Sequence, residues 1–289
     1  MSVTDQTPAA RATGPRRRRD LELDTTTPDP GYFGPQSVSW RVHHDPAALV
    51  GGLRALMLQS LLPGVMHGFY DNTDVHDDPW GRLMRTAGYV NVVVFGTHAE
   101  ADALSSHVRR VHHRLGLDDP GWLLWVHCGA VDSWLHAYRV SGAPMSDEDA
   151  DRYVAEQVVA ARLVGCDVAA VPTTRAELSA YLLSMRPELE VTPEAREAVR
   201  GVLWPPMDAR MTWTTPARPV WTLAALTAFG LLPRWARRLF ALPGLPTTDW
   251  SAAVVARTLR LSLLAIPEDR RTSPHVAAAR ARLGAPGPR

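Results

Sequence analysis

Lysine is absent from this 289-residue chain, and all 31 of its basic residues are arginines. Without lysine, catalysis through a Schiff-base lysine and phosphate binding by the lysine of a P-loop are both excluded. Cysteine is nearly absent as well, because Cys128 and Cys166 are the only two. Two cysteines do not form a disulfide framework, and we therefore expect a reducing, cytoplasmic location.

Several signatures of enzymes and membrane proteins are also missing. The chain has no glycine-rich dinucleotide fingerprint, no HExxH or paired ExxH metal motif and no Gly-x-Ser-x-Gly nucleophile elbow. The apolar run at 220–232 has 13 residues, whereas a transmembrane helix needs ~20, so we expect no transmembrane segment. A core helix, a solvated helix face and a helix lying on a membrane surface all stay open for 220–238.

The two ends of the chain differ in composition from its middle. The formal net charge is +1, and the clearest basic excess sits at the ends, so we expect no nucleic-acid partner. Residues 1–31 are polar, and the arginines at 16–19 are followed by an acidic segment, which excludes a twin-arginine export signal. We predict a disordered arm at 1–31, one helical domain at 32–266 and a basic flexible tail at 267–289.

Between the ends, the apolar spacing predicts helices only. Residues 50–62 are apolar nearly all round, which is typical of a central buried helix. Residues 122–140 predict a second buried helix, and the β-branched segment 88–95 is expected to continue the helix before it. Helix starts are indicated by the capping boxes at Ser146 and Thr174 and by Thr192 before a proline.

One predicted helix carries a cationic face. Asp78 can cap its start and Pro79 suits its first position, because proline lacks an N–H group. Arg82, Arg85 and Thr86, together with Tyr89 one turn on, follow at i, i+3, i+4 and i+7 and so share one face. An anionic ligand would balance this face if it is buried, and a solvated surface would equally explain it.

A second predicted helix, at 99–115, carries three histidines. Its apolar stripe consists of Leu104, Val108, Val111 and Leu115. His112 falls at the edge of that stripe, whereas His113 points to the opposite side. An inward histidine is either a hydrogen-bonded core residue or a ligand, and both interpretations stay open for His112. A non-haem metal site from His67, Asp71, His76 and Asp77 is a further alternative.

Several segments, taken in order, resemble one known family. They are PQSVSWR at 35–41, GGLRAL at 51–56, DPWGRLMRT at 78–86, VRRVH at 108–112 and LWVH at 124–127. Together they are similar to the MpaB-type oxygenases, which share their catalytic domain with the latex-clearing rubber oxygenases. The resemblance covers roughly residues 33–265.

The resemblance implies an all-α fold built around a pocket for one b-type haem. It places the essential Arg-x-x-x-Thr pair at Arg82 and Thr86, the iron ligand at His112 and a further cofactor contact at His127. Arg85 stands where the rubber oxygenases carry a lysine that can approach the iron, and arginine stays protonated and cannot be such a ligand. Leu62 stands where many members carry histidine, and the carboxylate base of the rubber oxygenases has no clear counterpart here.

We therefore expect a haem b-dependent oxygenase or oxidase in which the histidine-ligated iron activates dioxygen or peroxide. Arg82, Arg85 and Thr86 are its expected catalytic residues, and its substrate is a small intracellular molecule, aromatic or a natural product, rather than rubber. The alternative is a non-catalytic helical module that has lost haem and binds a small molecule or a protein. The residues do not choose among oxygen insertion, double-bond cleavage, dehydrogenation and radical coupling, nor do they fix the oligomeric state.

Overall fold

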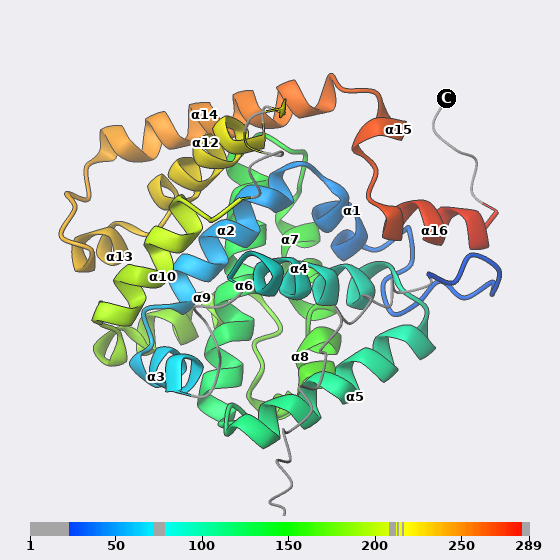
Figure 1. The fold of residues 1–289 in the computed structure, drawn as a ribbon, viewed down its shortest axis with the longest axis horizontal. Coiled ribbons are helices and arrows are strands. Elements are labelled where there is room, and N and C mark those ends of the chain that lie inside the picture. The colour runs from blue at the N-terminus through cyan, green and yellow to red at the C-terminus, as the bar shows by residue number, and fades with distance from the viewer. Residues whose placement is uncertain (1–22, 72–78, 208–211, 213, 216, 285–289) are drawn as a thin grey trace, which may run out of the picture.

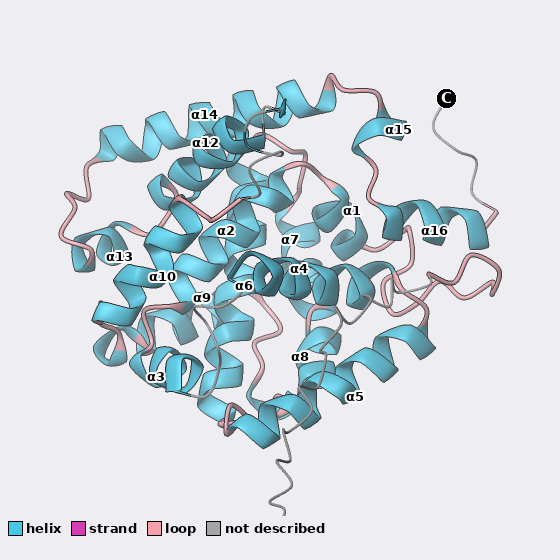
Figure 2. Ribbon diagram, viewed as in Figure 1, coloured by secondary structure: helices cyan, strands magenta, loops and turns pink. Residues whose placement is uncertain are grey.

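The structure is a computed structural model that describes residues 23–71, 79–207, 212, 214–215 and 217–284. Every regular element in these residues is a helix, and Figure 2 shows helices joined by loops in this part of the chain. The prediction of an all-α fold is therefore confirmed. The haem pocket that the resemblance implies stays a prediction.

The helices follow one another with short connections (Figure 1). The first six are α1 (Val38–His44), α2 (Ala47–Gln59), α3 (Pro63–Asp71), α4 (Pro79–Phe95), α5 (His98–Leu115) and α6 (Pro120–Val140). The next are α7 (Asp147–Glu156), α8 (Val158–Val164), α9 (Arg175–Ser184) and α10 (Pro193–Leu203), with 3-10 turns at Val168–Ala170 and Arg186–Glu188. The last are α12 (Ala217–Gly230), α13 (Arg234–Leu239), α14 (Pro246–Leu264), α15 (Glu268–Arg271) and α16 (Pro274–Arg282).

The centre of the fold is the antiparallel pair α2 and α6. The Trp125 indole donates to the carbonyl of Gln59 at 3.1 Å, near one end of the pair. At the other end, a Cβ on Gly51 would lie 2.6 Å from the Trp134 ring, so only glycine allows this close approach. The predicted central helix at 50–62 is thus confirmed as α2, and the helix at 122–140 is confirmed within α6.

Other helices cover this pair and complete the core. α12 packs on α2, α14 packs on α12, and residues of α10 join them in the largest buried apolar cluster. No single described helix is long and apolar enough to cross a membrane. By length and composition alone, α2 and α3 pass that test together, but the chain bends by 93° between them.

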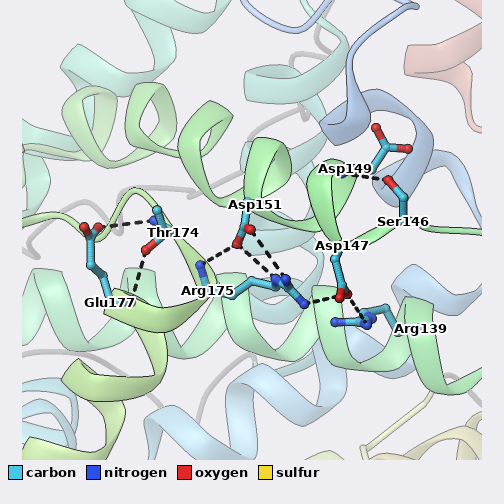
Figure 3. A network of polar contacts seen from close by, with 8 residues as sticks. All are labelled: Arg139, Ser146, Asp147, Asp149, Asp151, Thr174, Arg175 and Glu177. Atoms are coloured by element: carbon cyan, nitrogen blue, oxygen red, sulfur yellow. Dashed lines mark hydrogen bonds and ion pairs between the residues drawn. The ribbon is translucent and has the colours of Figure 1, made fainter.

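The helix starts predicted at Ser146 and Thr174 are also present, and they begin α7 and α9 (Figure 3). The side chain of Ser146 accepts from the N–H of Asp149, and Thr174 forms a complete capping box with Glu177. Arg175 then bridges the two helices, because its guanidinium donates to Asp147 at 2.7 Å and to Asp151 at 2.9 Å. This polar network ties the start of α9 to α7.

The prediction for the two ends of the chain is wrong in their described parts. Residues of the expected flexible tail form α15 and α16, and Arg282 donates to the carbonyls of Asp29 and Phe95. On the N-terminal side, the N–H of Asp24 donates to Glu100 at 2.9 Å. Both segments are therefore held against α4 and α5 by long-range hydrogen bonds, which a composition rich in arginine or proline does not reveal.

Candidate functional site

The candidate site lies on the antiparallel hairpin formed by α4 and α5. Thr97 begins α5 with a capping box, in which its hydroxyl and the Glu100 carboxylate satisfy each other's backbone N–H groups. Tyr89 of α4 meets Ser105 of α5, with their hydroxyl oxygens 3.3 Å apart. In an antiparallel hairpin, a residue two turns before Tyr89 lies level with a residue two turns after Ser105. These two residues are Arg82 and His112.

Arg82 is a half-buried cation on α4. Its guanidinium carbon lies 3.7 Å from the centroid of the Phe69 ring on α3. Burial, with a smaller contribution from the like charge of Arg85, lowers the pKa of Arg82 to about 10. Among the described residues Arg82 forms no ion pair.

His112 lies in the last turn of α5, and one of its ring nitrogens makes no hydrogen bond to the described residues. Its Nδ1 is buried and has no hydrogen-bond partner in the part of the chain that the structure describes. Burial lowers the pKa of His112, Asp118 opposes this change, and the Arg82 guanidinium adds to it. The ring is therefore kept neutral, which is the form that ligates metals.

The neighbouring histidine has the opposite environment. The side chain of His113 is 84% exposed, and its Nδ1 lies 2.7 Å from the Asp118 carboxylate. The predicted difference between an inward His112 and an outward His113 is thus confirmed. His107, which flanks the other edge of the apolar stripe, is exposed.

Arg85 and Thr86 lie one turn further along α4 and are both exposed. The hydroxyl of Thr86 donates to the carbonyl of Arg82 at 3.2 Å, within its own helix. The predicted shared face of α4 therefore has a half-buried residue, Arg82, next to two solvent-facing residues. The predicted N-cap residue Asp78 lies outside the described residues, and α4 begins at Pro79 as expected.

His127 lies in a different environment. It is half-buried on α6 and lines a small pocket. The other residues of this pocket include Val154 of α7, Leu178 of α9 and Pro172, which precedes α9. Burial lowers the pKa of His127 to about 4, so this ring too is neutral. The structure groups His127 with α7 and α9 rather than with Arg82 and His112, and its contact with a cofactor stays a prediction.

The residues that support the Arg82 side chain were not predicted from the sequence. Phe69 is carried by α3, and α3 rests with two glycines on the Trp122 indole of α6. A Cβ on Gly64 or Gly68 would lie 2.5 Å or 2.7 Å from that ring, so the close approach requires glycine at both positions. The only signal in the sequence is the spacing of these glycines, one helical turn apart, before an aromatic residue.

Comparison with known proteins decides the family. The family whose model matches is described as the ER-bound oxygenase mpaB/B'/rubber oxygenase catalytic domain, and the match spans residues 40–262. The chain belongs to this family. The resemblance found in the sequence is confirmed, and membership in this oxygenase family implies an oxidoreductase. No curated protein and no solved structure matches the chain.

The alternative of a non-haem metal site stays a prediction, because two of its four residues lie outside the described part of the chain. No group of three or more histidine, cysteine or acidic side chains in the described residues is arranged to hold a metal ion. His67 lies 3.9 Å from the carboxylate of Glu194, whereas His76 and Asp77 lie outside the described residues. The matched residues 40–262 include both Arg82 and His112.

Proposed function

We propose that this member of the oxygenase family is a haem b-dependent oxygenase or oxidase whose iron ligand is His112. The proposal rests on two side chains whose polar groups lack partners among the described residues. His112 has a buried ring nitrogen without a partner, and Arg82 is a half-buried guanidinium without an ion pair among the described residues. The two side chains are close enough for Arg82 to lower the pKa of His112.

These two groups fit the chemistry of a haem. A neutral imidazole is a common axial ligand of haem iron, and a guanidinium pairs well with a carboxylate such as a haem propionate. When bound, the haem would supply the activation of dioxygen or peroxide. Arg82 would orient the cofactor by holding its carboxylate, and this pairing would offset the cost of burying the guanidinium.

Arg85 and Thr86 have a different part in the proposal. Both are exposed on α4, one turn from Arg82, where their N–H and O–H groups can donate to a substrate or an oxidant. A guanidinium offers hydrogen-bond donors and no acceptor, so Arg85 cannot itself ligate iron. We propose that Arg85 and Thr86 act as hydrogen-bond donors, with Thr86 exchanging its bond to the Arg82 carbonyl for a bond to the reacting molecule.

We further propose a small apolar or aromatic substrate inside the cell. Trp80 lies two residues before Arg82 on α4 and packs edge-to-face on Trp221, with ring centroids 5.1 Å apart. The chain contains ten tryptophans, and their large flat rings favour a flat, apolar ligand where they line a pocket. Both cysteines are unpaired, which is compatible with a reducing compartment.

The test compares two neighbouring histidines. His112→Ala should abolish stoichiometric haem binding or convert the absorption spectrum to that of a weakly ligated haem, because the axial nitrogen is lost. His113→Ala removes a residue of the same type from the exposed side of α5 and should leave the wild-type spectrum and haem content unchanged.

The same measurement separates this proposal from its main alternative. If His112→Ala keeps the wild-type spectrum, the assignment of the ligand is wrong. If the wild-type protein stays colourless with full helical content after expression with haem supplied, the haem proposal fails. A non-catalytic binding module would then be favoured.

A further inference from the structure

The outer surface of α12 and α14 carries an unusual number of exposed apolar side chains. On α14, Trp250, Val254 and Leu261 lie at i, i+4 and i+11 and so form one stripe. Trp250 is 72% exposed, and Leu226 on α12 is 56% exposed. We define the α12–α14 face by its exposed apolar residues, which are Leu223, Leu226, Leu239, Leu242, Leu245, Trp250, Val254 and Leu261.

These residues lie on consecutive elements of the chain, which are α12, α13, the connection after α13, and α14. α12 and α14 are neighbours, and a Cβ on Gly230 would lie 2.8 Å from the Cβ of Ala252. Both helices pack on α2 with their inner sides, so their outer sides point away from the core. In Figure 1, α14 forms the upper border of the molecule, and the connection from α13 extends this border at one end.

The segment that carries the α12–α14 face contains many more basic than acidic residues. Residues 217–267 contain six arginines and a single acidic residue, Asp249. Asp249 forms ion pairs with Arg234 and Arg237, and Arg260 forms one with Asp45. Arg238 and Arg257 are exposed, and neither forms an ion pair within the part of the chain that the structure describes. The face is therefore apolar and basic at the same time.

We propose that the α12–α14 face binds the anionic surface of a lipid bilayer. Exposed tryptophan and leucine side chains gain free energy when they enter the interfacial region of a bilayer, and nearby arginines are attracted to anionic headgroups. A second copy of the chain is a poorer partner, because a symmetric dimer would place the same basic groups against one another. This inference concerns attachment to a surface and does not rest on haem binding.

The test uses the full-length protein and vesicles of stated composition. The protein should sediment with vesicles that contain phosphatidylserine and phosphatidylcholine, more strongly than with phosphatidylcholine alone. Added salt should release it, because salt screens the attraction between arginines and headgroups. Trp250→Ser together with Leu226→Ser should weaken vesicle binding by about tenfold or more, since both apolar side chains are lost from the contact.

Matched controls come from elsewhere on the surface. Leu183→Ser on α9 removes a leucine that is 57% exposed, nearly the same fraction as Leu226, and should leave vesicle binding unchanged. Arg238→Glu with Arg257→Glu should abolish the preference for phosphatidylserine. Arg114→Glu changes an exposed arginine of α5, which lies at the opposite border of the molecule in Figure 1, and should preserve that preference.

Two results would overturn the proposal. One is the absence of sedimentation with either kind of vesicle, or equal sedimentation of the wild type and the variant that lacks Trp250 and Leu226. The other is a stable dimer in solution that the same two substitutions dissociate, because the α12–α14 face would then be the contact between two copies.

Discussion

Buried arginines have a recognisable structural role in this protein. Arg54 donates to the carbonyl of Leu231, Arg237 to that of Gly230, and Arg282 to that of Phe95. All three carbonyls lie at helix ends, where they lack intrahelical partners and carry the negative end of the helix dipole. With no lysine in the chain, the planar guanidinium serves these acceptors, and it can bind a second group at the same time.

Arg82 differs from these three arginines. It is half-buried like a structural residue, yet among the described residues it has neither a carbonyl acceptor nor a carboxylate. Its contact with Phe69 supports the guanidinium without satisfying its N–H groups. The lack of such an acceptor among the described residues is the strongest reason, at the scale of single residues, to propose that Arg82 binds a ligand.

The first prediction compares Arg82 with Arg85, one turn apart on α4. Arg82→Gln should speed the loss of haem by roughly 10- to 150-fold, because a hydrogen bond to a charged group contributes roughly 1.5–3 kcal/mol. Arg85→Gln removes an exposed arginine and should change haem loss much less. The measurement is the rate of haem transfer to an excess of a haem acceptor protein. Equal rates for the two variants would mean that Arg82 does not hold the cofactor.

At the scale of elements, the position of Arg82 depends on how α3 is held. Gly64 and Gly68 form a flat side of α3 that rests on the Trp122 indole, and Phe69 follows directly. Moving α3 away from Trp122 would also move the Phe69 ring away from Arg82. The candidate site is therefore supported by three helices, α3, α4 and α6.

The second prediction tests this support with two glycine substitutions. Gly68→Ala would place a Cβ 2.7 Å from the Trp122 ring, so α3 must shift. We expect lower stability, by about 1–3 kcal/mol for an overpacked contact, and weaker haem retention. Gly88→Ala in α4 is the control, because its Cβ would meet no atom within 4 Å. It should raise stability by roughly 0.5–1 kcal/mol through helix propensity.

Urea unfolding followed by circular dichroism, together with the haem spectrum, checks both variants. If Gly68→Ala binds haem as tightly as the wild type, the position of α3 has no bearing on the site.

The elements near the site were predictable because their start signals are local. Pro79 begins α4, Thr97 caps α5, and Asp119 with Pro120 begins α6. These signals also set the register of the α4–α5 hairpin, which brings Arg82 level with His112. The role of α3 was not predictable, because it depends on a contact between Gly68 and Trp122, which are far apart in the sequence.

At the scale of the whole molecule, contacts between residues far apart in the sequence also explain why the prediction of a flexible C-terminal tail failed. Residues 267–289 have the composition of a flexible tail, but Val276 and Ala279 of α16 are buried in a cluster with Phe95. Arg282 then bonds to two segments that lie far away in the sequence. Composition describes what a segment contains, whereas these partners are set only when the whole chain folds.

Several half-buried histidines make the stability of the whole molecule dependent on pH. Burial lowers the pKa of His43 to about 3 and that of His127 to about 4. Burial also lowers the pKa of His136, with Arg54 adding to the effect. Each of these rings is neutral in the folded protein at a pH where the unfolded chain, with a histidine pKa near 6.5, already binds a proton.

The third prediction follows from the sign of this difference. Between pH 6.5 and about 4 the unfolded state binds more protons than the folded state, so the free energy of unfolding falls as the pH falls. Each of these histidines contributes about 1.4 kcal/mol per pH unit in this range. Urea unfolding at several pH values should show this slope, and His127→Gln should reduce it by the share of one histidine. The exposed His113→Gln should leave the slope unchanged. A free energy of unfolding that is equal at pH 7 and pH 5 would show that these histidines are protonated in the folded protein.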